Sequence, residues 1–232
     1  MAPNIIHFAT ISFLGFFPFI PVNNEAMVHT LEMHGYIKSR RVKDAFLKVD
    51  RANFVPEEHR SHAYFDDPIP IGHAQTISAP SMVAVMLELL DVFEGAKVLE
   101  VGTGSGYNAC LMGCIGAEVY SIERIPELRK LAKKNMENCP CKDNVHLLLG
   151  DGSVGYEEEA PYDRIIVTCG APDIPEPLKE QLKCGGIMVI PVGGTFFQEL
   201  YVLRKERHGW RKRVWGDVAF VPLVGRYGHR WA

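Results

Sequence analysis

The sequence predicts an α/β fold with a doubly wound, mostly parallel sheet and an antiparallel edge at its C-terminal end. Short apolar runs alternate with helical segments from residue 97 to residue 190, which is the pattern of parallel strands joined by crossover helices. A glycine cluster directly follows the first of these runs. The last two apolar runs, 200–205 and 218–223, flank a turn region at His208-Gly209 without a helical segment between them. They therefore predict the antiparallel edge.

Three segments precede the alternating part. Residues 27–52 have helical periodicity, and 81–93 form an apolar helix with Pro80 and Ser81 near its start. Residues 53–80 are rich in Pro, Gly and His and lack a sustained period. A connector of that length inside a compact domain is typical of a functional loop. The buried positions expected in the first helical segment are Leu31, Ile37, Val42, Ala45, Phe46 and Val49.

The alternating part supplies five strands and three helices. The strands are expected at 97–101, 118–122, 145–149, 163–168 and 187–190, and the helices at 107–115, 126–138 and 176–182.

The composition is that of an ordinary globular protein. The chain has 232 residues, of which 47% are hydrophobic and 23% charged, and its formal net charge is −3. A slightly acidic chain without a long basic run is not expected to bind nucleic acid as its main ligand.

The six cysteines do not match a zinc-binding pattern. Cys110 and Cys114 share one helical face, and Cys139-Pro140-Cys141 falls in a loop, but neither pair has a second pair at zinc-finger spacing. We expect no metal, and reduced thiols in a cytoplasmic protein.

The N-terminus is strongly apolar from Ile5 to Ile20. It lacks the basic start and the cleavage site of a secretory signal, and Gly15 and Pro18 interrupt a stretch already short for a membrane span. Two interpretations remain, a weak anchor or an extension upstream of a functional start at Met27, and we favour the second. We expect residues 1–26 to lie outside the fold and 27–232 to form one domain without stable membrane association.

The carboxyl ends of the first two strands suit a nucleoside ligand. Gly102, Gly104 and Gly106 follow the strand 97–101 and open the next helix, so that the backbone can turn tightly and approach a ligand. Glu123 ends the second strand about twenty residues later, where a carboxylate accepts the two hydroxyls of a ribose. NAD and S-adenosylmethionine both fit this arrangement.

Two further acidic residues favour S-adenosylmethionine. Glu100 lies just inside the glycine loop, where its charge would repel a pyrophosphate and attract an amine. Asp151, at the end of the third strand, can accept the adenine amino group while Gly152 offers its backbone N–H. Taken alone, Asp151 would be an ordinary turn residue, but it is the third acidic strand end in succession.

These residues carry a resemblance to the protein-L-isoaspartate O-methyltransferases, from Met27 to Gly228. The most specific match is Gln75–Pro80, which resembles the family's hallmark ahead of the cofactor loop. Ala74 departs from a common glycine, and Val83 stands where some relatives place a histidine. The other matching motifs are 98–107, Gly150-Asp151-Gly152, 160–163, Gly185-Gly186, 190–193 and 220–223.

The resemblance implies a seven-stranded, Rossmann-like methyltransferase sheet with added N-terminal helices. It also implies a monomeric repair enzyme. The enzyme would methylate the free α-carboxylate of L-isoaspartyl residues, and the β-carboxylate of D-aspartyl residues, in age-damaged proteins, giving the methyl ester and S-adenosylhomocysteine. The implied cofactor residues are Gln75, Thr76, Ile77, Glu100, Gly102, Thr103, Gly104, Gly106, Glu123, Arg124, Asp151 and Gly152, and the implied substrate residues are Ser78, Val221 and Leu223.

Ser78 is the expected catalytic residue. A carboxyl group has an ordinary pKa of about 4 and is already ionised at neutral pH, so no general base is needed. A hydroxyl can orient the carboxylate without protonating it. The alternative role for Ser78 is an N-cap of the helix 81–93.

Three other functions are weaker interpretations. A nucleic-acid amino-methyltransferase would carry an Asn/Asp-Pro-Pro-aromatic motif after the fourth strand, where this chain has 168–172, TCGAP. A small-molecule O-methyltransferase has no reason to carry Gln75–Ser78. A non-catalytic binding module is disfavoured because every cofactor position is intact.

Overall fold

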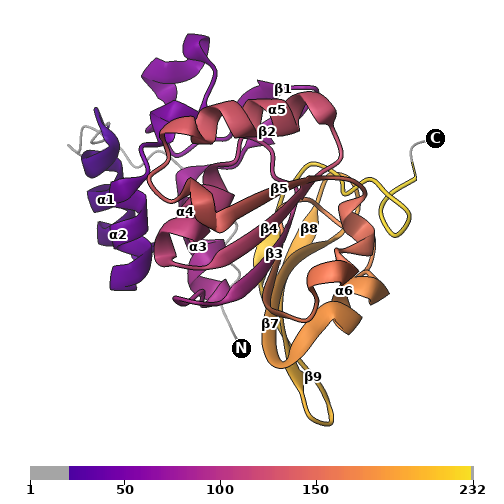
Figure 1. Ribbon diagram of the computed structural model, residues 1–232. Helices are drawn as coiled ribbons and strands as arrows, with labels where there is room; N and C mark the ends of the chain where they lie inside the picture. Colours follow the sequence, from indigo (N-terminus) through magenta and orange to yellow (C-terminus); the bar gives the residue numbers. More distant parts are fainter. Residues whose placement is uncertain (1–20, 231–232) are drawn as a thin grey trace.

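The computed structural model describes residues 21–230 and contains a seven-stranded sheet in the order β5-β4-β3-β6-β7-β8-β9. Strands β3 to β7 are parallel, and β8 and β9 run antiparallel at the C-terminal edge. The predicted fold class is therefore confirmed. Figure 1 shows the long β8–β9 hairpin extending beyond the rest of the sheet.

The helices are α1 (Asn24–Met33), α2 (Arg40–Lys48), α3 (Pro80–Leu90), α4 (Tyr107–Ile115), α5 (Pro126–Asn135) and α6 (Glu176–Gln181). The strands of the large sheet are β3 (Lys97–Val101), β4 (Glu118–Glu123), β5 (Val145–Leu149), β6 (Tyr162–Val167), β7 (Leu182–Gly193), β8 (Gln198–Glu206) and β9 (Gly209–Val218). A separate two-stranded hairpin consists of β1 (Ile69–Gly72) and β2 (Gln75–Ile77).

The central strands of the sheet are buried on both faces. Successive strand residues point to opposite sides, so Val98 and Ile166 pack against one core while Leu99 and Ile165 pack against the other. The first core contains side chains of α1 to α5, and the second is covered by α6 and short turns. This two-sided burial explains why the central strands are almost continuously apolar in sequence.

The N-terminal segments differ from their predicted bounds. The predicted helix 27–52 is divided into α1 and α2, and between them Gly35 has a φ of +73° that favours glycine. All six predicted core positions of this segment are buried. Helix α1 begins at Asn24, whose side chain donates to the Phe46 carbonyl, so residues 24–26 belong to the fold and the expected boundary at Met27 is wrong. The rest of the expected extension, 1–20, lies outside the described residues.

The predicted strand 218–223 is wrong. The partner of β8 is β9, which ends at Val218, and residues 219–223 contribute only an isolated bridge between Pro222 and Gly170. Strand β9 was not predicted because Arg211, Lys212 and Arg213 lack the apolar pattern of a buried strand. They are tolerated because β9 is an edge strand, where charged side chains are common.

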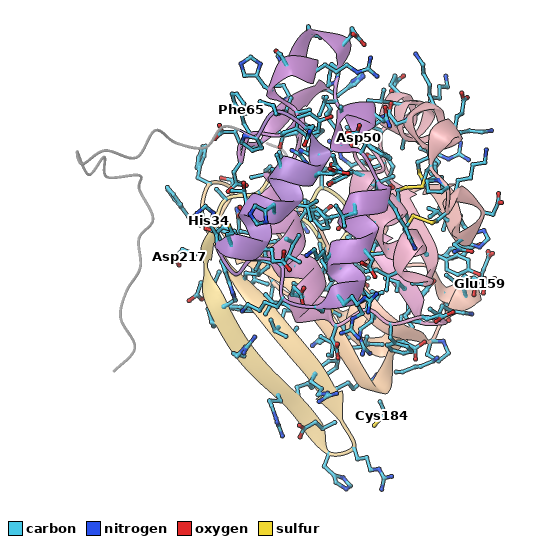
Figure 2. The ribbon with its side chains drawn as sticks, turned by 90° about the vertical axis from the view of Figure 1, so that its left-hand side faces the viewer. His34, Asp50, Phe65, Glu159, Cys184 and Asp217 are labelled. Carbon is cyan, nitrogen blue, oxygen red and sulfur yellow. A yellow bond between two sulfur atoms is a disulfide. The ribbon has the colours of Figure 1, made fainter. Side chains whose placement is uncertain are left out.

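Four cysteines form two disulfides, which contradicts the expected reduced thiols. Cys110 is bonded to Cys139 and Cys114 to Cys141; these are the yellow bonds in Figure 2. Both bonds join α4 to the connection between α5 and β5. Because 110 and 114 are one helical turn apart, their shared face meets both cysteines of the loop. Cys169 and Cys184 are free thiols.

None of the helices between residues 21 and 230 combines the length and the apolar character needed to span a membrane.

Candidate active site

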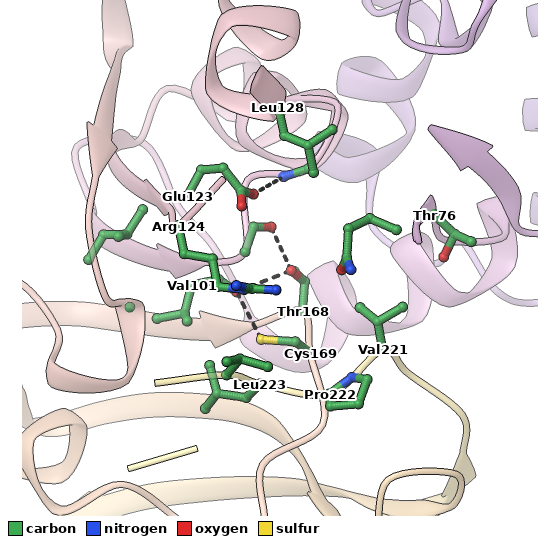
Figure 3. A pocket seen from close by; sticks show the side chains of 16 residues that line it. Thr76, Val101, Glu123, Arg124, Leu128, Thr168, Cys169, Val221, Pro222 and Leu223 are labelled. Atoms are coloured by element: carbon green, nitrogen blue, oxygen red, sulfur yellow. Dashed lines mark hydrogen bonds between the residues drawn. The ribbon is translucent and has the colours of Figure 1, made fainter. Parts of the chain in front are cut away.

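The candidate site lies at the carboxyl ends of β3, β4 and β6, the edge at which ligands bind in doubly wound sheets. Two hollows meet there and share Thr76, Gly102, Gly104 and Thr168. Figure 3 shows Glu123 and Leu128 on one side of the first hollow and the 221–223 segment on the other. The first hollow is also lined by Gln75, Arg124, Gly152 and Cys169, and the second by Ile77, Ser78, Val83, Thr103, Ser105, Tyr107 and Asn108.

Two of the predicted glycines are required by close packing. Gly102 has a φ of +98°, and a Cβ there would lie 2.5 Å from the Thr168 hydroxyl. A Cβ on Gly152 would lie 2.5 Å from a methyl group of Val101. A side chain at either position would displace these neighbours at the floor of the hollow, so packing there requires glycine at both positions.

Glu123 is buried at the end of β4, as predicted, and braces the glycine loop. Its carboxylate accepts hydrogen bonds from the backbone N–H groups of Gly104 at 2.9 Å and Ile125 at 3.0 Å. Each carboxylate oxygen can accept a further bond, and Glu123 lines the first hollow. It is therefore held in place with acceptor capacity left for the hydroxyls of a ribose.

Glu100 lies beneath the loop rather than in a hollow. It is fully buried, and burial raises the pKa of its carboxyl to about 7 despite hydrogen bonds from Ser121 and Asn108. The Asn108 amide donates to Glu100 at 2.7 Å, while its own carbonyl oxygen is buried without a partner. Asn108 lines the second hollow.

These two residues test whether the expected cofactor fits. A buried acceptor without a partner costs free energy until a donor reaches it. The side-chain carbonyl oxygen of Asn108 is such an acceptor, at the wall of the second hollow and beside the buried Glu100. An ammonium group supplies both the missing N–H and a positive charge. The site thus fits the amino-acid end of S-adenosylmethionine, and Glu123 in the adjoining hollow fits its ribose.

Ser78 follows β2 and lines the second hollow, half-buried. Its carbonyl accepts a hydrogen bond at 2.8 Å from the guanidinium of Arg51, which also donates to the Ala63 carbonyl at 2.9 Å. Arg51 is fully buried against the Tyr107 ring, and burial lowers its pKa to about 10, so it stays charged at neutral pH. Arg51 therefore fixes both ends of the 63–78 segment that carries the β1–β2 hairpin.

The N-cap role considered for Ser78 is not what the structure has. The cap position of α3 is Ala79, without a side-chain cap. Instead the Asp66 carboxylate accepts a hydrogen bond from the Ser81 N–H at 2.8 Å, and so satisfies one of the N–H groups in the first turn that have no partner within the helix. The Ser78 hydroxyl is thus not used for helix capping.

Asp151 is engaged by the C-terminal segment. Its carboxylate accepts hydrogen bonds from the Ser153 backbone and hydroxyl and, at 2.7 Å, from the Arg226 N–H. Gly225 lies so close that a Cβ there would collide with the same carboxylate. Gly152 lines the first hollow whereas Asp151 is not among its lining residues, so the adenine contact predicted for Asp151 stays a prediction.

The predicted substrate residues Val221 and Leu223 line the first hollow. Their segment is fixed to the end of β6, because the Gly170 N–H donates to the Val221 carbonyl at 2.8 Å and the Leu223 N–H donates to the Gly170 carbonyl at 2.7 Å. The segment therefore closes the hollow opposite Glu123 (Figure 3).

Most predicted residues thus meet at the two hollows, except Glu100, Gly106 and Asp151, which are not lining residues of either hollow. Sequence reasoning missed Arg51, Asn108, Thr168 and Cys169. Asn108 and the pair 168–169 stood next to recognised positions, one at the start of a helix after the glycine loop and the other at the end of the fourth strand. Arg51 had no such signal, because it acts through backbone carbonyls distant in sequence.

Sequence comparisons agree with this site. The family model described as Protein-L-isoaspartate(D-aspartate) O-methyltransferase (PCMT) matches residues 22–228. A protein-L-isoaspartate O-methyltransferase of Pyrococcus abyssi is 55% identical over 206 residues, covering 88% of this chain and 95% of the relative. One of Methanopyrus kandleri is 53% identical over 208 residues, covering 88% and 92%.

Solved structures give the same result. The chain resembles a putative protein-L-isoaspartate O-methyltransferase of Plasmodium falciparum, solved in complex with S-adenosyl-L-homocysteine, with a TM-score of 0.78 and 30% identity. That match covers 87% of this chain and 98% of the other.

Proposed function

The chain belongs to the protein-L-isoaspartate (D-aspartate) O-methyltransferase family, and on that premise we propose how its site performs the reaction. The methyl group of S-adenosylmethionine is transferred to the free α-carboxylate of an L-isoaspartyl residue in a damaged protein. The observation that carries the proposal is the meeting of the two hollows at Thr76, Gly102, Gly104 and Thr168. Support comes from the glycine loop, which lines both hollows, and from Ser78, which lines the second one.

Cofactor binding is assigned to the loop and strand ends. Glu123 receives the ribose hydroxyls, and Gly102 and Gly152 allow close approach of the backbone. Asn108, backed by Glu100, receives the ammonium group. The predicted contacts of Gln75, Thr76, Ile77, Thr103 and Arg124 belong to the same proposal, supported by their places in the lining.

Alignment of the acceptor is assigned to Ser78. When bound, S-adenosylmethionine supplies a methyl group activated by the positive sulfur. The acceptor carboxylate is ionised at neutral pH, so Ser78 donates a hydrogen bond that orients it and removes no proton. Val221 and Leu223 exclude water from the attacking oxygen. Positioning of this kind contributes up to about 7–11 kcal/mol to lowering a barrier.

The activity is tested with a matched pair of peptides, one with an isoaspartyl residue and its twin with ordinary aspartate. Methyl transfer from labelled S-adenosylmethionine should reach the first peptide only. Labelling of both peptides, or of neither, would overturn the proposed function. A third peptide containing D-aspartate tests the second substrate that the family description names.

The role of Ser78 is tested by Ser78→Ala. Loss of a hydrogen bond to a charged group costs about 1.5–3 kcal/mol, so kcat should fall roughly 10- to 150-fold. Affinity for S-adenosylhomocysteine, measured by calorimetry, should stay within about twofold of wild type, because backbone anchoring of residue 78 by Arg51 is retained. A large loss of cofactor affinity instead would move Ser78 to cofactor binding. Ser81→Ala is the matched control.

We further propose a monomeric, cytoplasmic enzyme that does not bind nucleic acid. A site built from one chain supports the monomer, and a methyl donor made inside cells supports the location. The two disulfides are compatible with that location because intracellular proteins of hyperthermophiles carry disulfides. Light scattering coupled to size exclusion tests the monomer, and a dimer mass would contradict it.

A further inference from the structure

Two phenylalanines on the turn that joins β7 to β8 are largely exposed to solvent. Phe196 and Phe197 are 80% and 77% exposed, more than any other aromatic side chain in the described range 21–230. Single exposed apolar side chains are ordinary, but adjacent ones beside a binding site mark an interaction surface. Neither has a role in the reaction described above.

The turn is held rigidly at the substrate side of the site. The side chain of Gln198, which is 3% exposed, accepts a hydrogen bond from the Phe220 N–H at 2.8 Å and donates to the Gly194 carbonyl at 2.6 Å. It occupies the space left by Gly170, where a Cβ would lie 2.7 Å from it. Gln198 therefore links the turn directly to the 220–223 segment.

The turn is also close to the hollow. Val192 bridges Ala171, and Gly170 bridges Pro222, which lines the first hollow. Phe197 adjoins Gln198, whose side chain reaches the Phe220 N–H, and Phe220 adjoins Val221 in the lining of the hollow. Because consecutive Cα atoms are about 3.8 Å apart, this path places the Phe197 backbone roughly 10–15 Å from the hollow. An extended polypeptide covers that distance in about three to four residues. Phe220 and Val221, both half-buried, lie along this path.

Building on the proposed function, we propose that Phe196 and Phe197 bind an apolar side chain of the substrate polypeptide, two to four residues from the isoaspartyl residue. Damaged sites occur in many sequence contexts, so the reacting group alone offers little area for binding. Two aromatic rings supply apolar contact that does not depend on a defined sequence. The pair thereby selects flexible chain segments that expose an apolar residue near the damage.

The test compares two isoaspartyl peptides that differ only at positions two to four residues from the isoaspartyl group, with Leu in one and Ser in the other. Wild-type kcat/KM should be about tenfold higher for the Leu peptide. In F196S/F197S the ratio should fall to within about twofold of one, through KM and with kcat unchanged. The KM for S-adenosylmethionine should not change. The single variants Phe196→Ser and Phe197→Ser should each give part of the effect.

The matched control is Trp210→Ser, an exposed aromatic residue at the far end of the β8–β9 hairpin. It should keep the wild-type ratio. Equal wild-type activity on both peptides, an unchanged ratio in the double variant, or an equal loss on both peptides would overturn the inference. If wild type methylates neither peptide, the proposed function itself has failed, and that result is seen before any variant is made.

Discussion

The two halves of the sheet differ in how they hold the residues of the candidate site. On the β3–β5 side, a buried Glu123 braces the glycine loop and two disulfides join α4 to the connection between α5 and β5, beside the residues proposed to bind the cofactor. On the β6–β9 side, an isolated bridge and a glutamine hold the 220–223 segment, and two phenylalanines are left in solvent. A cofactor of constant structure can be bound by rigid, buried polar contacts. A polypeptide of varied sequence is better bound by exposed apolar area.

The largest expected effect concerns the disulfides of the cofactor half. They close loops with sequence separations of 29 and 27 residues, for which loop entropy predicts about 3–4 kcal/mol each. Reduction of both should lower the midpoint of thermal unfolding by roughly 10–30 °C. Calorimetry with and without a reductant measures the shift. Cys184→Ser, in the substrate half, should leave the midpoint unchanged. Six reactive thiols in the native protein would contradict the pairing.

The next effect concerns Glu123. Glu123→Gln replaces an oxygen acceptor with an amide donor that faces the Gly104 or Ile125 N–H. Two N–H groups would then face each other without an acceptor, and a contact to the ribose would be lost. Together these changes cost about 2–3 kcal/mol of binding free energy. Affinity for S-adenosylhomocysteine should therefore fall about 30- to 150-fold by calorimetry. Glu127→Gln, exposed on the first turn of α5, is the control. An unchanged affinity would remove Glu123 from the site.

The smallest effect is the pH dependence given by Glu100. Burial raises its pKa to about 7, so the free protein holds a proton there at pH 6 and has lost most of it by pH 8. A bound ammonium group favours the ionised carboxylate, so binding should release a proton near neutral pH. Affinity for S-adenosylhomocysteine should rise about three- to tenfold from pH 6 to pH 8. Glu100→Gln should flatten this profile, and identical profiles would contradict the coupling.

Glu100 also makes folding stability depend on pH, in the opposite direction from the affinity for S-adenosylhomocysteine. Its folded-state pKa is about 7 and its ordinary value 4.5, so the folded protein binds the proton more tightly than the unfolded chain. The free energy of unfolding should therefore fall as pH rises from about 4.5 to 7 and show no further contribution from Glu100 above that.

Sequence reasoning was most successful where local pattern and burial agree. The bounds of β3, α4 and β5 were predicted without error because each is an apolar run closed by glycine or a turn. It failed where tertiary position overrides local character. The basic strand β9 is stable only because β8 pairs with it, and the disulfides depend on a loop folding against α4. Arg51 was missed for the same reason, since its partners are carbonyls brought together by the fold.

The basic edge strand has a consequence for an enzyme of this kind. Its substrates are damaged chains with free backbone N–H and C=O groups, and such chains can add as an extra strand to any open sheet edge. Arg211, Lys212 and Arg213 cover the open edge at β9 with charge. Charged side chains on an exposed edge strand make strand addition there costly. The same charges that hid β9 in the sequence therefore disfavour pairing of a substrate chain with this edge of the sheet.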